Sequence, residues 1–270
     1  MALLLGVVIG FTLGWLLVLA LKRPRKVKVP TEIEFWVYLP SAEMPTQNEV
    51  MGDLAQTPAL TPQDLLLLSD IRLHVALALK EKNLEQFRPD LLDSYVEPSA
   101  ETLQAISESK ALARVRFTSE TPMLDDRHLR LVPYYAYAIA RRTGAKAVLD
   151  VSASRLMQVT DLEALLKSDR RLAEPLSQVR IIWLTDELGG TVSTRGFGKR
   201  GWPELRTLPI QPDQRILVLQ LFEEAVRQLW PLAAIPATIS LEAYGDEFSL
   251  FINPPERGIH PVRIGRMHQQ

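Results

Sequence analysis

Cysteine is absent from this sequence of 270 residues, and histidine and aromatic residues are scarce, with four histidines and 7% aromatics. The absence of cysteine excludes disulfides, thiolate metal sites and cysteine nucleophiles, and it fits a reducing compartment. The sequence also contains no H-x-x-x-H pair, G-x-S-x-G elbow or Walker sequence, the signatures of several large enzyme classes. We therefore expect no metal and no other cofactor, and we lean towards a protein that is not an enzyme.

Acidic residues are absent from the first 28 positions, which hold five of the 31 basic residues. The rest of the chain therefore carries 26 basic against 32 acidic residues, a net charge of −6. An acidic domain binds nucleic acid poorly, so no nucleic-acid partner is expected. With 47% hydrophobic and 23% charged residues, this part is ordinary globular material, enough for one large domain or two small ones.

Long apolar runs are limited to one, from Ala2 to Leu21, which contains no charged side chain. Twenty residues at about 1.5 Å each give a helix of roughly 30 Å, the thickness of a bilayer's hydrocarbon core. The run predicts a single transmembrane helix over residues 1–21. A cleaved signal peptide fits less well, because no basic residue precedes the run and a basic cluster follows it in place of a cleavage site.

The basic residues of this juxtamembrane segment, 22–31, all lie on one side of the predicted span: Lys22, Arg23, Arg25, Lys26 and Lys28. The positive-inside rule then predicts a bacterial inner-membrane protein with its N-terminus outside and its C-terminal domain in the cytoplasm. The same side chains can contact anionic lipids.

Glycines repeat at intervals of four within the predicted span, at Gly6, Gly10 and Gly14. Such spacing leaves one helix face bare, so two helices can approach closely and form a homodimer. Glycine is also common in transmembrane helices without pairing, and both interpretations remain open.

The remaining patterns predict one cytoplasmic α+β domain over residues 32–253, with a proline-rich loop at 40–62 and an irregular tail at 254–270. Residues 65–83 read either as a helix followed by a strand or as one helix, and His74 reads as a core residue. Further helices are expected at 98–110, 126–142, 160–166 and 211–230. Strands are expected at 32–39, 113–118, 147–151, 179–184, 191–194, 238–243 and 247–252. The frequent hairpins favour a mixed or antiparallel sheet with helices on one face.

Residues 196–201 read Gly-Phe-Gly-Lys-Arg-Gly and match G-x-G-x-x-G letter for letter. A dinucleotide site needs a helix directly after this motif, and Trp202-Pro203 leaves no room for one. We therefore predict a glycine-rich turn between strands. Its cations could bind an anion, with Arg195, Lys199 and Arg200 as the candidates.

A second candidate group combines Asp125, Asp126 and His128 at a helix start with Asp150 at the end of a buried strand. Two carboxylates near an imidazole could move protons, which keeps open a hydrolase or transferase as the alternative function. The plainer interpretation is that Asp125 or Asp126 caps the helix and that Asp150 pairs with Arg155.

Two stretches carry a resemblance to known families: residues 134–155, a helix followed by Leu-Asp-Val-Ser-Ala, and residues 191–205, which end in Gly-Trp-Pro-Glu-Leu. Over about residues 98–230 the chain is similar to bacterial families of domains of unknown function. Those families often carry a histidine before the turn, where this chain has Ser193, Thr194 and Arg195. The resemblance implies no catalytic residues. Our leading hypothesis is a membrane-tethered binding or scaffold module with a protein partner of unknown identity.

Overall fold

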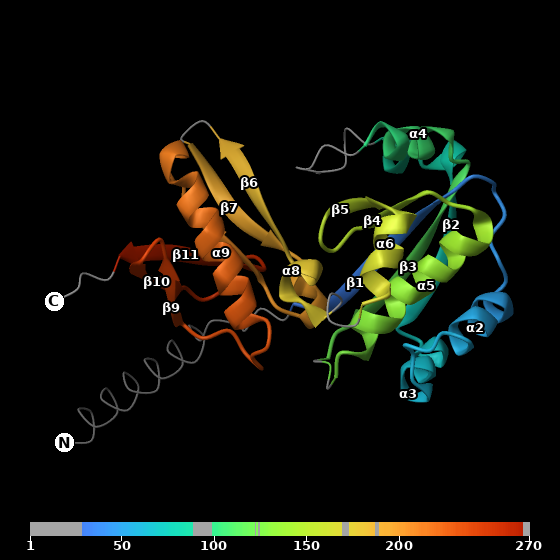
Figure 1. Ribbon diagram of the computed structural model, residues 1–270, viewed down its shortest axis with the longest axis horizontal. Helices are drawn as coiled ribbons and strands as arrows, with labels where there is room; N and C mark the ends of the chain where they lie inside the picture. Colours follow the sequence, from blue (N-terminus) through green and yellow to red (C-terminus); the bar gives the residue numbers. More distant parts are fainter. Residues whose placement is uncertain are drawn as a thin grey trace, which may run out of the picture.

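The structure, a computed structural model, describes residues 29–88, 99–121, 123, 125–168, 173–186 and 189–266. The predicted span from Ala2 to Leu21, its three glycines and the basic residues 22–28 lie outside these ranges. Within the described ranges, no helix combines the length and apolar character needed to cross a bilayer. The described residues form an α+β fold with two sheets arranged along the long axis (Figure 1).

The first sheet is antiparallel, with strand order β2-β3-β1-β4-β5. Its central strand β1 is buried over most of its length because the run Phe35-Trp36-Val37-Tyr38-Leu39 presents large apolar side chains to both faces. The five strands are β1 Thr31–Leu39, β2 Leu73–Leu79, β3 Ala111–Ser119, β4 Ala147–Asp150 and β5 Arg155–Gln158.

Helices cover both faces of this sheet, not one face as the sequence predicts. Helix α5 (Arg127–Thr143) packs on β1 and β3, and α2 (Gln47–Ala55), α3 (Pro62–Leu65) and α6 (Val159–Leu166) pack around it. On the other face, α4 (Ala100–Glu108) and the 3-10 turn η3 (Leu84–Phe87) cover Tyr38, Leu112 and Leu149. The second layer is needed because β1 is apolar on both sides.

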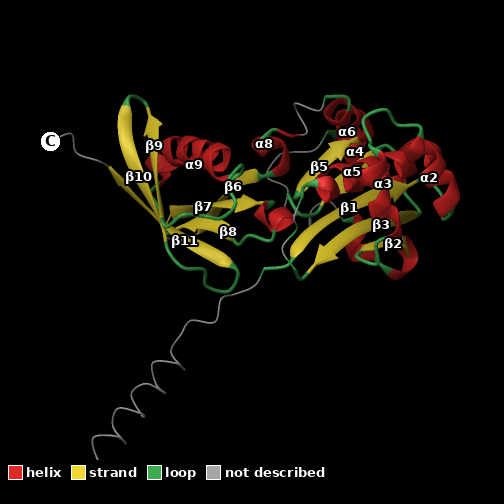
Figure 2. Cartoon of the chain, turned by 90° about the horizontal axis from the view of Figure 1, so that it is seen from below, coloured by secondary structure: helices red, strands yellow, loops and turns green. Residues whose placement is uncertain are grey.

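The second sheet is mixed, with order β6-β7-β8-β11-β10-β9 and one parallel pair, β8 with β11. Helix α9 (Arg215–Leu229) packs on it, and the short α8 (Pro175–Gln178) contacts α9 (Figure 2). Its strands are β6 Arg180–Asp186, β7 Gly189–Arg195, β8 Glu204–Thr207, β9 Thr238–Ala243, β10 Asp246–Ile252 and β11 Ile259–Arg266.

Several predicted elements are confirmed. The hairpins β6–β7 and β9–β10 form, and α5 ends at Gly144. Residues 65–83 contain a helical segment followed by a strand, since α3 and η1 (Leu66–Ser69) precede β2, and η2 (Lys80–Lys82) follows it. A last 3-10 turn, η6 (Pro212–Gln214), leads into α9.

Three further predictions about the fold are wrong. The loop at 40–62 contains α2, which begins with a capping box between Thr46 and Glu49. The tail from 254 contains β11, which lies between β8 and β10 in the interior of the second sheet. His74 is exposed, because β2 is an edge strand whose outer face is open.

Both sheets contribute to one continuous hydrophobic core, which includes Ile33 and Val115 from the first sheet, Val192 from the second and Phe222 from helix α9. The contact between the sheets runs through η5 (Phe197–Arg200), the 3-10 turn between β7 and β8, which packs against β1. The glycine-rich segment, residues 196–201, therefore lies at the junction between the two sheets.

Candidate functional site

The glycine-rich segment forms a tight turn between strands, as predicted, and the four-residue η5 leads into β8 without a long helix. Gly196 has φ of +124°, and a Cβ there would lie 2.3 Å from the carbonyl oxygen of Gln178. Only glycine fits this approach. Because the motif leads into a strand and not into a long helix of its own, the dinucleotide interpretation has no structural basis in this segment.

An anion does occupy the turn, and it belongs to the chain itself. The Glu204 carboxylate accepts hydrogen bonds from the backbone amides of Gly196 at 2.9 Å and Gly198 at 3.3 Å. It also accepts one from the Thr194 hydroxyl at 2.7 Å. The backbone donors that could have bound an external anion are thus satisfied by a side chain eight residues along the chain.

Lys199 forms a buried ion pair that links the two sheets. Its Nζ lies 2.6 Å from an Oδ of Asp150 at the end of β4 and 3.3 Å from Oε1 of Gln178. Burial lowers the pKa of the Lys199 ammonium, and the Asp150 carboxylate opposes that shift. Asp150 therefore pairs with Lys199 and not with Arg155, whose guanidinium donates to the carbonyl oxygens of Leu176 and Ser177.

Arg200 makes a second link across the junction. Its guanidinium pairs with Asp126, donates to the carbonyl oxygen of Trp230 at 2.6 Å, and lies over the rings of Trp202 and Trp230 at 5.7 and 4.8 Å. Arg195, the third cation proposed for an anion site, ends β7 opposite Arg180.

His128 completes the junction from the first turn of α5. Its Nε2 lies 2.7 Å from the carbonyl oxygen of Lys199, and its ring stacks on Phe117 at 5.3 Å. Burial lowers the pKa of His128, so the neutral ring is favoured, with Nε2–H as the donor. Asp126 is the N-cap residue of α5, but its side chain makes no capping hydrogen bond. The preceding Asp125 accepts from the Arg127 amide at 3.1 Å and pairs with the Arg127 guanidinium.

The two candidate groups predicted separately therefore meet: Asp126, His128 and Asp150 each contact the segment Lys199–Arg200. Lys199, Asp150 and Nε2 of His128 are committed to partners inside the protein, and these three side chains are buried. Nδ1 of His128 is also buried but has no hydrogen-bond partner. A catalytic group must reach its substrate, so this arrangement gives the hydrolase or transferase alternative little support. Among the described residues, no three histidine or carboxylate side chains gather into a potential metal site.

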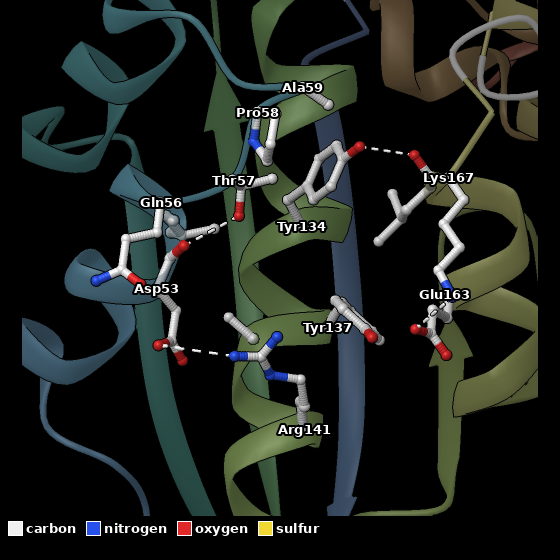
Figure 3. A pocket seen from close by; sticks show the side chains of 13 residues that line it. Asp53, Gln56, Thr57, Pro58, Ala59, Tyr134, Tyr137, Arg141, Glu163 and Lys167 are labelled. Carbon is white, nitrogen blue, oxygen red and sulfur yellow. Dashed lines mark hydrogen bonds and ion pairs between the residues drawn. The ribbon is translucent and has the colours of Figure 1, made fainter.

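An open pocket lies elsewhere, between α5, α6 and the end of α2 (Figure 3). Its volume is about 430 Å³, within the range of small-molecule sites. Apolar groups form much of the pocket wall, and charged side chains from α2, α5 and α6 lie at its rim. The lining residues are Asp53, Leu54, Gln56, Thr57, Pro58, Ala59, Tyr134, Tyr137, Ala138, Arg141, Glu163, Leu166 and Lys167.

Two carboxylates and two cations edge this pocket, and they are not equally paired. Glu163 holds Lys167 at 2.8 Å, whereas Asp53 binds Arg142 at 2.6 Å and reaches Arg141 only at 4.0 Å. The Arg141 side chain is 64% exposed. Its guanidinium is therefore the cation best placed to meet a ligand.

The two tyrosines supply aromatic surface to the pocket. The Tyr134 hydroxyl donates to the carbonyl oxygen of Leu166 at 2.6 Å, which ties α5 to α6. Burial raises the pKa of the Tyr137 phenol, and its hydrogen bond to Glu163 raises it further. The Tyr137 hydroxyl is thus a neutral donor at physiological pH.

This pocket is not among the predicted sites, although the sequence contains a signal for it. Tyr134, Tyr137 and Arg141 recur at helical spacing and so share one face of α5. What the sequence did not reveal is that α6 and the segment after α2 would flank this face and leave it partly open.

Comparisons with models of protein families, with curated proteins and with solved structures found no match to this chain. The function of this chain is therefore inferred from its own residues. The resemblance of residues 98–230 to domains of unknown function stays a prediction.

Proposed function

We propose that this chain is a single-pass, membrane-anchored binding module whose α+β body faces the cytoplasm at a bacterial inner membrane. The uncharged run from Ala2 to Leu21 and the basic residues that follow it support the anchor and its orientation. In the α+β body, the charged groups at the junction between the sheets are paired internally, whereas the pocket beside α5 is open to solvent. This arrangement supports a binding module over an enzyme.

The observation that carries the binding function is the loosely paired Arg141 beside apolar and tyrosine walls. Such a site fits a ligand that has an aromatic or aliphatic body and one acidic group. The acidic group would meet Arg141, and the body would lie against Tyr134 and Tyr137. An acidic side chain of a protein partner offers the same chemistry as a small aromatic acid.

Aromatic carboxylates test this site directly. In thermal-shift and NMR titrations of the detergent-solubilised full chain, we expect a set of small aromatic acids to include binders. Arg141→Gln should remove their binding, and Tyr137→Ala should weaken it, while Ile216→Ala on α9 leaves it unchanged. Binding that is absent, or that is insensitive to Arg141→Gln, contradicts this pocket as the ligand site.

Cysteine labelling tests the anchor and its orientation, since a single introduced cysteine is unique in this chain. Ala42→Cys lies at an exposed position after β1. We expect a membrane-impermeant maleimide to label it in inverted inner-membrane vesicles and not in intact spheroplasts. Labelling in spheroplasts, or loss of the protein from the membrane fraction, contradicts the proposal.

Helix pairing through Gly6, Gly10 and Gly14 would make the module a homodimer, and a reporter of helix association in membranes tests it. Gly10→Ile places a bulky side chain in the middle of the glycine face. Association that is unchanged in Gly10→Ile removes the dimer from the proposal and leaves the anchor intact.

A further inference from the structure

The loop between α9 and β9 is apolar and open to solvent. Residues 231–237 read Pro-Leu-Ala-Ala-Ile-Pro-Ala, without a charged or hydrogen-bonding side chain. Leu232 is 40% exposed, and Ala233 and Ala234 are also exposed, while Ile235 packs on the core. A contiguous apolar surface of this kind marks an interaction site more often than scattered apolar residues do.

The base of this loop is held firmly. Trp230 is buried and packs on Phe197 and Trp202, with ring centroids 6.1 and 6.4 Å away. Arg200 donates to the carbonyl oxygens of Trp230 and Leu232 and is itself paired with Asp126. The apolar tip is therefore carried on a fixed aromatic and cationic support. In Figure 1 the loop follows α9 and leads into β9.

The same support lies beside the point where the chain enters the body. Next to Arg200, Gly201 is so close to β1 that a Cβ there would meet the Thr31 hydroxyl at 2.8 Å and the Val29 carbonyl oxygen at 3.2 Å. Only residues 22–28 separate Val29 from the end of the predicted span. Seven extended residues reach at most roughly 25 Å, so the loop is held near the bilayer.

We propose that residues 231–237 contact the bilayer's interfacial layer and orient the body on the membrane. The inference rests on the proposed anchor. Pro, Leu, Ala and Ile side chains gain by leaving water for the acyl boundary. The basic residues 22–28 would draw the same side of the body towards anionic headgroups.

Site-specific fluorescence on the full chain tests this contact. The probe is an environment-sensitive nitrobenzoxadiazole group on Ala233→Cys, in vesicles of phosphatidylethanolamine and phosphatidylglycerol, some with nitroxide-bearing lipid. The matched control is Ile216→Cys, which lies 70% exposed at the other end of α9, about 20 Å along the helix. Both substitutions fall on exposed positions, so folding should be preserved.

We expect blue-shifted emission and strong loss of fluorescence to nitroxide lipid at position 233, with water-like emission and little loss at position 216. If the chain floats with the vesicles and the two positions behave alike, the loop contact is wrong while the anchor stands. If the chain does not float with the vesicles, the anchor fails and the loop contact falls with it.

Discussion

Two lysine–carboxylate ion pairs with nearly equal N–O distances have different roles in this protein. Lys199 and Asp150 lie 2.6 Å apart at the junction, with side chains 1% and 4% exposed. Lys167 and Glu163 lie 2.8 Å apart at the pocket, with side chains 73% and 35% exposed. The distance between the charges is almost the same, and the surroundings differ completely.

The difference shows that burial, more than distance, decides what such a pair does. At the junction both charges have lost their water, so each depends on the other and on fixed neighbours such as Gln178. At the pocket, water and salt screen the pair, and either side chain can turn to a ligand at little cost. The junction joins two sheets, and the pocket stays adaptable.

Removing one partner of each pair should give the largest contrast. Lys199→Met leaves Asp150 charged and buried without its partner, which should lower the free energy of unfolding by about 3–5 kcal/mol. Lys167→Met should lower it by roughly 0–0.5 kcal/mol. Urea unfolding of the full chain in detergent, followed by tryptophan fluorescence, measures both.

The double variant Lys199→Met/Asp150→Leu separates lost charge pairing from lost packing. Replacing both charges by apolar groups of similar size should recover much of the stability. If Lys199→Met costs no more than Lys167→Met, burial is not what distinguishes the two pairs.

Removing the Glu204 carboxylate from the glycine turn should have the next largest effect on the free energy of unfolding. Glu204→Ala leaves the amides of Gly196 and Gly198 without their acceptor, which should cost about 2 kcal/mol. Glu204→Gln keeps a side-chain oxygen as acceptor and should cost less. The same urea unfolding compares the two, and equal losses would mean that the amides do not depend on this acceptor.

Much of the fold could be predicted because its signals are local. Alternating apolar residues marked the hairpins, and Gly144 marked the end of α5. The helix α2 was hidden by the prolines around it, although Thr46 and Glu49 form a recognisable capping box. Strand β11 was hidden by Pro254 and Pro261, and it forms because it pairs with β10 on one side and β8 on the other.

The candidate site could be predicted from the sequence to a smaller extent than the fold. The chemistry of the glycine turn and of the Asp125–His128 group is visible in the sequence, but their meeting is not. His128 and Lys199 are 71 residues apart, and a contact between them depends on how two sheets pack. Whether a charge is buried is also a tertiary property, so the sequence could not separate a structural ion pair from a binding site.

The next, smaller effect is the pH dependence of the free energy of unfolding, which His128 at the junction should cause. The pKa of His128 is lowered in the folded protein, whereas the unfolded chain binds this proton near pH 6.5. Below about pH 6.5 the unfolded state therefore binds more protons, and stability is lost as pH falls towards the lowered folded pKa. His128→Gln should flatten this part of the profile in urea unfolding at several pH values. His74→Gln, at an exposed position on β2, should leave it unchanged.

The smallest effect concerns the exposed pair. Lys167 is the main cause that holds the pKa of Glu163 below its ordinary value, and Tyr137 is the second. Lys167→Met should therefore raise the pKa of Glu163 more than Tyr137→Phe does, as measured by NMR titration of its carboxyl carbon. Each substitution should change the free energy of unfolding by no more than about 0.5 kcal/mol. A larger pKa change in Tyr137→Phe would mean that the phenol, and not the lysine, controls this carboxylate. In that case the pocket would resemble the junction, where a fixed neighbour governs a charge, more than its exposure implies.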